Sequence, residues 1–381
     1  MPPTILDSHI HLWPSTATSP KDHAWMTPGL PLAKRHGVQD YAAATAAAPV
    51  RLAGFVYVET DRHVPSASVD LRPGSSLGEG DVEAELRAWA RAPLEEFAFL
   101  RRVVEGRVQE GDGARGDDGA MLKGMVIWAP FHVQEEVFGT FLRLARDVLG
   151  EEAWARVVGF RLHLTREPWL TSERRYLLQG RTAEEVKSII GNERFVRNVK
   201  FACGKEERRL AFDVGIDAHR DGIEALEAVV ALIEGVEEEE GVNFVLNHLC
   251  KPDLSTPTWP SFPRWQACMG RLSSHLNVYM KLSGALNEFA PSAAPASVDA
   301  VLDTLRPYLD CVLQSFGAHR VLFGSDWPVC NVGGPKGEAR NWGFWVVVVE
   351  RYLEEKGLSE KDKEWVWAKS AAAAYGIKEL R

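Results

Sequence analysis

The sequence has few cysteines, and they follow no pattern. Five occur in 381 residues, an odd number, and no two have the C-x-x-C spacing of a zinc ribbon or redox motif: Cys203, Cys250, Cys268, Cys311 and Cys330. This arrangement excludes a disulfide framework, so we expect reduced thiols.

Long apolar runs and excess positive charge are also missing. No stretch approaches the roughly 18 apolar residues of a membrane helix, and the four valines at 346–349 are too few. The N-terminus has no basic segment followed by an apolar one, so we expect a cytoplasmic protein with no membrane partner. A formal net charge of -9 argues against nucleic acid and favours a small-molecule partner.

What is present is a set of eight short apolar runs, most of them followed by turn residues and an amphipathic stretch. Parallel strands in βα units have this pattern. We predict a single domain over 1–381, a (β/α)₈ TIM barrel. A doubly wound sheet is the alternative, but no G-x-G-x-x-G follows the first run. The predicted strands are 5–11, 52–58, 123–129, 157–164, 210–215, 243–247, 278–283 and 321–324.

Helices are predicted at 82–104, 136–149, 221–235, 297–315 and 342–355, with a last one at 360–375 packing on the outside of the barrel. Two connections are too long for plain loops. Residues 61–120 form an insertion after the second strand, and their Gly- and Asp-rich part, 109–119, is expected to be mobile. Residues 165–200 follow the fourth strand, where they predict a lid over the barrel mouth or, equally, a homodimer contact.

The first strand carries two histidines at its C-terminal end. Side chains of a strand alternate between faces, so Asp7, His9 and His11 are expected on one face. Two imidazoles side by side can bind a metal ion or hold a substrate oxygen. Trp13, which follows directly, is a candidate substrate contact.

Three other strands become polar near their ends. Glu59 shares a predicted face with Tyr57, Arg161 with His163, and Tyr279 with Lys281. Buried charges need partners, so these side chains predict a polar pocket at the mouth with substrate-binding roles for Glu59, Arg161, His163, Tyr279 and Lys281. For any one of them alone, a structural salt bridge is the simpler interpretation.

The sixth and eighth strands each end in a further candidate. His248 stands at the end of the sixth, where it can contact substrate or metal, or cap a carbonyl. Asp326 ends the eighth strand, which a closed barrel places beside the first. A carboxylate there can bind a metal and accept a proton from water, although it could also cap the next helix.

Four motifs together resemble the amidohydrolase-2 branch of the amidohydrolase superfamily, and within it the sugar-lactone hydrolases. They are Asp-Ser-His-Ile-His-Leu-Trp at 7–13, Asn-His-Leu-Cys-Lys-Pro at 247–252, Lys-Leu-Ser-Gly at 281–284 and Phe-Gly-Ser-Asp-Trp-Pro-Val at 323–329. The resemblance implies a barrel that opens a lactone, such as L-rhamnono-1,4-lactone, with water. It implies that Asp326 is the general base, that His9 and His11 polarise the carbonyl or ligate a metal, and that His248 assists.

The resemblance leaves the cofactor open. Related decarboxylases use zinc and some related lactonases use no metal, so one zinc ion on His9, His11 and Asp326 and metal-free catalysis are both expected possibilities. The fifth strand lacks the terminal histidine of the metal-binding pattern, which argues against a binuclear centre; His219, His163 and Glu59 are the substitutes at hand.

Two other functions compete with a lactonase. One is a zinc-dependent decarboxylase or amidohydrolase on the same barrel. The other is a non-catalytic barrel that binds a small molecule, against which the retention of His9, His11, His248 and Asp326 speaks.

Overall fold

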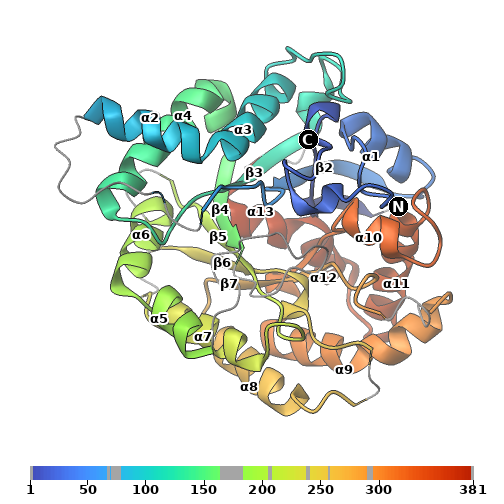
Figure 1. The fold of residues 1–381 in the computed structure, drawn as a ribbon. Coiled ribbons are helices and arrows are strands. Elements are labelled where there is room, and N and C mark those ends of the chain that lie inside the picture. The colour runs from blue at the N-terminus through green and yellow to red at the C-terminus, as the bar shows by residue number, and fades with distance from the viewer. Residues whose placement is uncertain are drawn as a thin grey trace.

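Eight parallel strands form one sheet in the order β1 to β8, and helices surround it (Figure 1). The structure is a computed structural model that describes residues 3–66, 69, 79–163, 183–204, 208–236, 241–255, 258–289 and 295–378. The sheet closes where Ile10, at the end of β1, pairs in parallel with Trp327, just beyond β8. This closure confirms the predicted (β/α)₈ barrel and excludes the doubly wound sheet.

All eight strands lie where the apolar runs predict them. They are β1 (Thr4–Ile10), β2 (Arg51–Val58), β3 (Leu122–Trp128), β4 (Val157–His163), β5 (Ala211–Gly215), β6 (Asn243–Leu246), β7 (Val278–Leu282) and β8 (Val321–Phe323). The helices are α1 (Val38–Thr45), α2 (Glu79–Trp89), α3 (Arg91–Val104), α4 (Glu135–Trp154), α5 (Ala183–Ile190), α6 (Glu193–Cys203), α7 (Ile223–Glu234), α8 (Phe262–Ser273), α9 (Val298–Phe316), α10 (Val329–Gly333), α11 (Asn341–Glu355), α12 (Glu360–Glu364) and α13 (Ser370–Tyr375).

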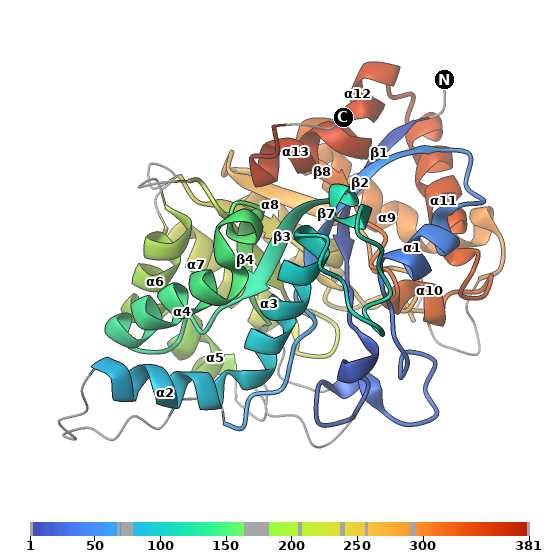
Figure 2. The same cartoon turned by 90° about the horizontal axis from the view of Figure 1, so that it is seen from above.

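The last helical segment packs on the outside of the barrel, where Trp367 contacts Phe323 at a ring-centroid distance of 5.0 Å, and it also covers one end. Ala371, Ala374 and Tyr375 pack with apolar side chains from inside the barrel, among them Leu6 and Val245. Figure 2 shows α12 and α13 on the side where β1 begins. Because these helices close the end where strands start, the opposite end is left for the mouth.

An irregularity in β1 changes which residues face inward. Between Asp7 and Ile10 the strand gains a residue against its neighbour β2, as in a β-bulge. Asp7 therefore faces the helices, where Tyr41 and Trp342 donate hydrogen bonds of 2.9 Å to its carboxylate. The prediction that Asp7 shares a face with His9 and His11 is wrong, because the bulge resets the alternation between them.

The insertion after β2 is more ordered than its composition predicts. The single helix predicted at 82–104 is two helices, and the second begins at Arg91 with Pro93 in its first turn, where a missing N–H is tolerated. The Gly- and Asp-rich loop at 109–119 is tied to α3, because Arg102 donates two hydrogen bonds to the buried Asp112. These contacts argue against the predicted mobility.

The C-terminal part of the segment predicted as a lid lies outside the barrel and not over its mouth. Residues 164–182 are outside the described residues. The end of the segment, α6, packs through Phe195 and Val199 against the barrel wall. Asn198 donates to the carbonyl oxygens of Phe131 and Val133 at 2.9 Å. Residues 193–203 therefore belong to the outer helical layer and do not cover the mouth.

A search of the helices in the described ranges found none with the length and apolar character needed to cross a bilayer.

Candidate active site

The hydrogen bonds that close the barrel also position Asp326. The Asp326 N–H donates to the carbonyl of His9 at 2.9 Å, and the His11 N–H donates to the carbonyl of Trp327 at 2.8 Å. Asp326 itself has a positive φ of 57°. The two backbone bonds hold its carboxylate against the end of β1, although more than three hundred residues separate the two strands.

His9, His11 and Asp326 form a compact group, here called the His–His–Asp group. The two Nε2 atoms are 3.2 Å apart, and Asp326 Oδ1 lies 3.5 Å from that of His9 and 3.3 Å from that of His11. All three side chains are almost fully buried. The group confirms that barrel closure brings the ends of the first and last strands together.

His248 joins this group from a left-handed turn. Residues 248–251 all have positive φ, between 47° and 57°, which is costly for L-residues. The turn directs His248 Nε2 to 3.8 Å from Asp326 Oδ1, while its Nδ1 lies 2.9 Å from Ser283 Oγ. Lys251, at the end of the same turn, pairs with Glu288 at 3.1 Å.

The environment favours neutral histidines around an ionised carboxylate. Burial, and then the charge of Lys281, hold the pKa of His9 well below its usual value. Burial also lowers the pKa of His11 and His248. Burial alone would raise the pKa of Asp326, but the polar and charged groups around it, Lys251 among them, outweigh burial and the pKa is lowered. At neutral pH the carboxylate can therefore accept a proton.

A small polar cavity opens onto this group at the mouth. It is lined by His11, Trp25, Arg161, His163, Gly215, Ile216, His248, Lys251, Asp326 and Val329. Among the lining residues that the structure describes, most polar side chains are cationic or imidazole groups, and Asp326 is the single carboxylate. Such a lining suits a ligand rich in oxygen atoms.

The predicted substrate-binding residues are only partly brought together. Arg161 and His163 line the cavity. Glu59 lies behind Arg161 and accepts a hydrogen bond from its Nε at 2.5 Å, and both side chains are buried. Lys281 is fully buried below His9.

Two predicted residues lie away from the cavity lining. Tyr279 packs at the closed end with Ala372 and Ile377, so the structure does not bring it to the mouth. Trp13 is buried behind Trp25, with ring centroids 5.7 Å apart, and donates to the carbonyl of Lys34.

Among the described lining residues with a polar or aromatic side chain, sequence reasoning missed Trp25 and Lys251. Lys251 stands three residues after His248 in the quoted Asn-His-Leu-Cys-Lys-Pro motif, and that proximity was a usable signal. Trp25 lies in a single-turn 3₁₀ helix, Ala24–Met26, which is too short to show periodicity, and its ring contacts His11 at a centroid distance of 4.8 Å. No local sequence pattern predicts the contact between these two rings.

The ligand atoms of the His–His–Asp group are close enough together to bind one metal ion. The hydrogen bonds at the far nitrogens of the two histidines are suited to metal binding for His11 but not for His9. Among the described residues, the three ligand atoms of the group lie within 4.8 Å of one another. His11 Nδ1 donates to the carbonyl of Val58 at 2.9 Å, as a metal-bound histidine commonly does. His9 Nδ1 instead faces the ammonium of Lys281 at 3.1 Å, which offers it no acceptor. Within the described part of the chain, the residues therefore do not complete a resident metal site.

The substitute ligands considered from the sequence stand apart from this group. His219 Nε2 lies 3.7 Å from Asp253 Oδ1. Among the described residues, the clustered ligand atoms belong to His9, His11 and Asp326, so His219 is not one of them. His163 and Glu59 are likewise outside the group.

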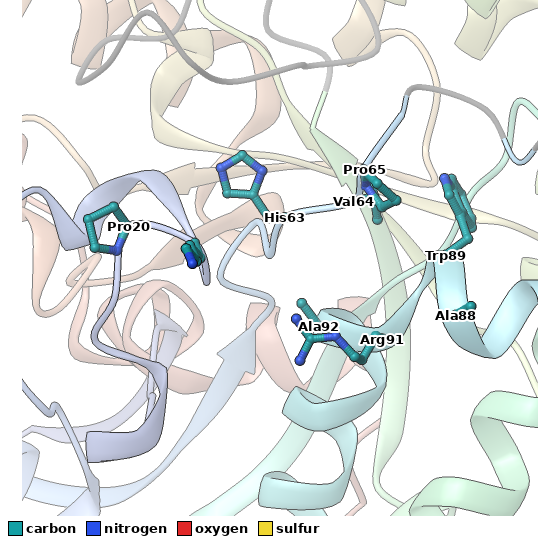
Figure 3. Close-up of a pocket in the computed structure, with 9 residues that line it drawn as sticks. Pro20, His63, Val64, Pro65, Ala88, Trp89, Arg91 and Ala92 are labelled. Atoms are coloured by element: carbon teal, nitrogen blue, oxygen red, sulfur yellow. The ribbon is translucent and has the colours of Figure 1, made fainter.

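A second hollow of about 420 Å³ lies beside the start of α3 (Figure 3). It is lined by Pro20, Lys21, His63, Val64, Pro65, Ala88, Trp89, Arg91 and Ala92. It shares no described lining residue with the cavity at Asp326, and none of its described lining residues is a carboxylate. The cavity at Asp326 is therefore the better candidate for hydrolytic chemistry.

Two proteins to which this chain is similar are named as sugar lactonases. An L-rhamnono-gamma-lactonase of Scheffersomyces stipitis is 24% identical over 380 residues, covering 98% of both chains. An L-fucono-1,5-lactonase of Burkholderia ambifaria is 30% identical over 136 residues, 36% of this chain and 42% of that protein.

Solved structures share the fold. An amidohydrolase from Burkholderia multivorans with bound zinc superimposes with a TM-score of 0.65 at 20% identity, over 98% of this chain and 100% of that one. A putative 2-pyrone-4,6-dicarboxylic acid hydrolase from Pseudomonas putida gives a TM-score of 0.55 at 16% identity, over the whole of both chains.

The amidohydrolase family model matches residues 140–377. This stretch includes His248 and Asp326 and begins after His9 and His11. Because the matched residues make up more than half of the chain, the protein belongs to the amidohydrolase-2 family.

Proposed function

We propose that this protein hydrolyses a sugar lactone, L-rhamnono-1,4-lactone or a similar aldonolactone, to the open-chain acid. The observation that carries the proposal is the ionised Asp326 within 3.3–3.8 Å of the Nε2 atoms of three buried histidines. The full-length similarity to a protein named as a rhamnonolactonase supports the choice of substrate.

The residues of the cavity suggest how the reaction proceeds. Asp326 accepts a proton from water as the water oxygen attacks the lactone carbonyl carbon. His11 Nδ1 must donate to the carbonyl of Val58, so its Nε2 carries a lone pair and can orient that water as an acceptor. Donors around the carbonyl oxygen stabilise the tetrahedral intermediate. When the ring C–O bond breaks, the proton held by Asp326 passes to the leaving alkoxide.

Recognition of the sugar is assigned to the rest of the lining. Arg161, His163 and Lys251 present donors toward the cavity in which a polyhydroxylated ring would lie. Burial of Arg161 against Glu59 keeps its guanidinium in one orientation. Fixed donors discriminate between sugars that differ in the positions of their hydroxyl groups. A sugar that places no oxygen opposite a buried donor leaves that donor without a hydrogen bond and binds less tightly.

The first test is the initial rate of acid release from L-rhamnono-1,4-lactone, with L-fucono-1,5-lactone for comparison. Each is measured on chelator-treated protein and again after zinc is restored. Equal rates support hydrolysis by the protein's own residues. A rate that appears only with zinc would favour the zinc-dependent alternative, and no rate on either lactone would contradict the proposed substrates.

Asp326→Asn tests the base directly. We expect kcat to fall by about 10²–10⁴-fold, because the amide cannot accept the proton, with little change in substrate affinity or thermal stability. Asp299→Asn, on the exposed start of α9, is the matched control and is expected to keep full activity. An active Asp326→Asn variant would rule out the proposed mechanism.

A further inference from the structure

Lys281 connects the candidate site to the closed end of the barrel. Its Nζ lies 2.6 Å from Asp213 Oδ2 and 3.1 Å from His9 Nδ1, and its side chain has no exposed surface. The other oxygen of Asp213 accepts a hydrogen bond of 2.7 Å from the hydroxyl of Tyr375, in α13. These three residues form a buried chain, here called the Lys281 chain, that ends on the imidazole of His9.

The contact with Lys281 determines where His9 carries its proton. A lysine ammonium has three donors and no acceptor, so His9 Nδ1 must be the accepting nitrogen. A neutral imidazole that accepts at Nδ1 carries its hydrogen on Nε2. The carboxylate of Asp213, 2.6 Å from Lys281 Nζ, favours the ammonium form and opposes the effect of burial, which lowers the pKa of Lys281. Within the described part of the chain the fully buried His9 has no second hydrogen-bond partner at Nδ1.

This tautomer gives the two neighbouring histidines opposite roles. His9 Nε2–H is a donor, whereas His11 Nε2 has a lone pair because its Nδ1 donates to Val58. The 3.2 Å separation of the two Nε2 atoms matches a hydrogen bond from His9 to His11. A lactone carbonyl oxygen that enters the site can take over that donor. A metal ion would need a lone pair on both atoms.

We propose that Lys281 is a positioning residue that holds His9 as the Nε2–H tautomer, which makes His9 the donor to the lactone carbonyl and keeps zinc out of the His–His–Asp group. The catalytic half rests on the proposed function. The tautomer and the exclusion of zinc do not depend on any substrate, so they can be measured separately.

The test replaces Lys281 without leaving a buried charge behind. Lys281→Met alone would strand Asp213 as an unpaired carboxylate, so the main variant combines Lys281→Met with Asp213→Asn. The amide oxygen that this second change introduces can still accept the hydrogen bond from Tyr375. Lys281→Arg, which keeps a donor-only side chain, is the conservative variant, and Tyr375→Phe tests the far end of the chain.

Three readouts are taken on the intact protein. Ring ¹H–¹⁵N correlation spectra assign the His9 tautomer, titration calorimetry with zinc alone measures metal affinity, and lactone kinetics separate kcat from KM. In the wild type we expect a protonated Nε2 and a bare Nδ1 on His9. In the double variant we expect about 10–100-fold tighter zinc binding and a lower kcat with a similar KM. Lys281→Arg is expected to remain close to the wild type.

Each outcome decides the proposal. A hydrogen on Nδ1 of His9 in the wild type, or equal zinc affinity in the wild type and a folded double variant, would overturn it. If the wild type hydrolyses no lactone but the spectra and zinc titrations are as expected, the proposed substrate fails and the role of Lys281 stands. If the double variant does not fold, the wild-type spectra and the measurements on Lys281→Arg test the proposal instead.

Discussion

At the scale of single residues, the position of His248 depends on a glycine. Gly284 follows β7 with a φ of +64°, and a Cβ added there would lie 2.3 Å from His248 Nδ1. Ser283, next to it, has its Oγ 2.9 Å from the same nitrogen. The Lys-Leu-Ser-Gly motif therefore supplies both a partner for the imidazole and the space that it occupies.

Gly284→Ala is expected to displace His248 and lower kcat by about 10²-fold, the scale of a 1 Å error in a catalytic group. Gly357→Ala is the matched control, because Gly357 has a φ of +65° and no atom within 4 Å of an added Cβ. Both variants are expected to lose about 1–2 kcal/mol of unfolding free energy from the left-handed backbone. Lactone kinetics and chemical denaturation measure the two effects, and equal activity in both variants would contradict this role of Gly284.

At the scale of elements, the loop at 109–119 shows how tertiary contacts order a polar segment. Asp112 is buried, and it accepts two hydrogen bonds from Arg102 and one from the N–H of Gln109. On the other side, the N–H of Gln39 donates to the carbonyl of Gly113 at 2.9 Å. Amino-acid composition alone predicts a mobile loop, because composition does not reveal that the loop forms hydrogen bonds with residues of α3 and α1.

Asp112→Ala is expected to release this loop. It leaves Arg102 without its partner and should lower the free energy of unfolding by about 1–3 kcal/mol, the cost of lost bonds to a charged group. Trypsin should then cleave faster at Arg107 and Arg115, while lactone hydrolysis changes little. Asp117→Ala, an exposed residue with no capping hydrogen bond in the same loop, is the control. Equal cleavage of both variants would show that Asp112 does not order the loop.

At the scale of the whole molecule, the barrel gathers histidines that stay neutral in the folded state. The pKa values of His9, His11 and His248 are lowered, chiefly by burial, whereas an unfolded chain titrates its histidines near about 6.5. Below that pH the unfolded state binds more protons than the folded state. The contribution of these histidines to stability therefore falls as the pH decreases through this range. The pKa of Asp326 is lowered from 3.8, so its own contribution is lost only under stronger acid.

From about pH 7.5 to about pH 5 we expect the buried histidines to make the melting temperature decrease, while Glu59, whose pKa burial raises to about 7, contributes in the opposite direction. His248→Asn removes one of the buried histidines and should make this decrease shallower. His319→Gln, whose side chain is 59% exposed, is the control and should leave the slope unchanged. Melting curves at constant ionic strength measure both, and an equal pH dependence in the wild type and in His248→Asn would contradict the assignment of a neutral His248.

The sequence by itself determined the eight strands, the barrel, and the meeting of His9, His11, His248 and Asp326. Apolar periodicity is a local property, and once a barrel is inferred its closure places the last strand beside the first. Once the barrel was inferred, the residues at the C-terminal ends of its strands could be assigned to the mouth.

Only the tertiary structure decided which neighbours these residues acquire. The bulge in β1 turned Asp7 toward the helices, and Lys281 came to lie under His9, 272 positions away in the chain. Strand alternation predicts a face but not the partner across the barrel. That partner depends on bulges, on side-chain length and on helix α13 at the closed end, where Tyr375 reaches Asp213. The protonation of His9 is therefore a property of the folded barrel, since no residue near it in sequence supplies the donor.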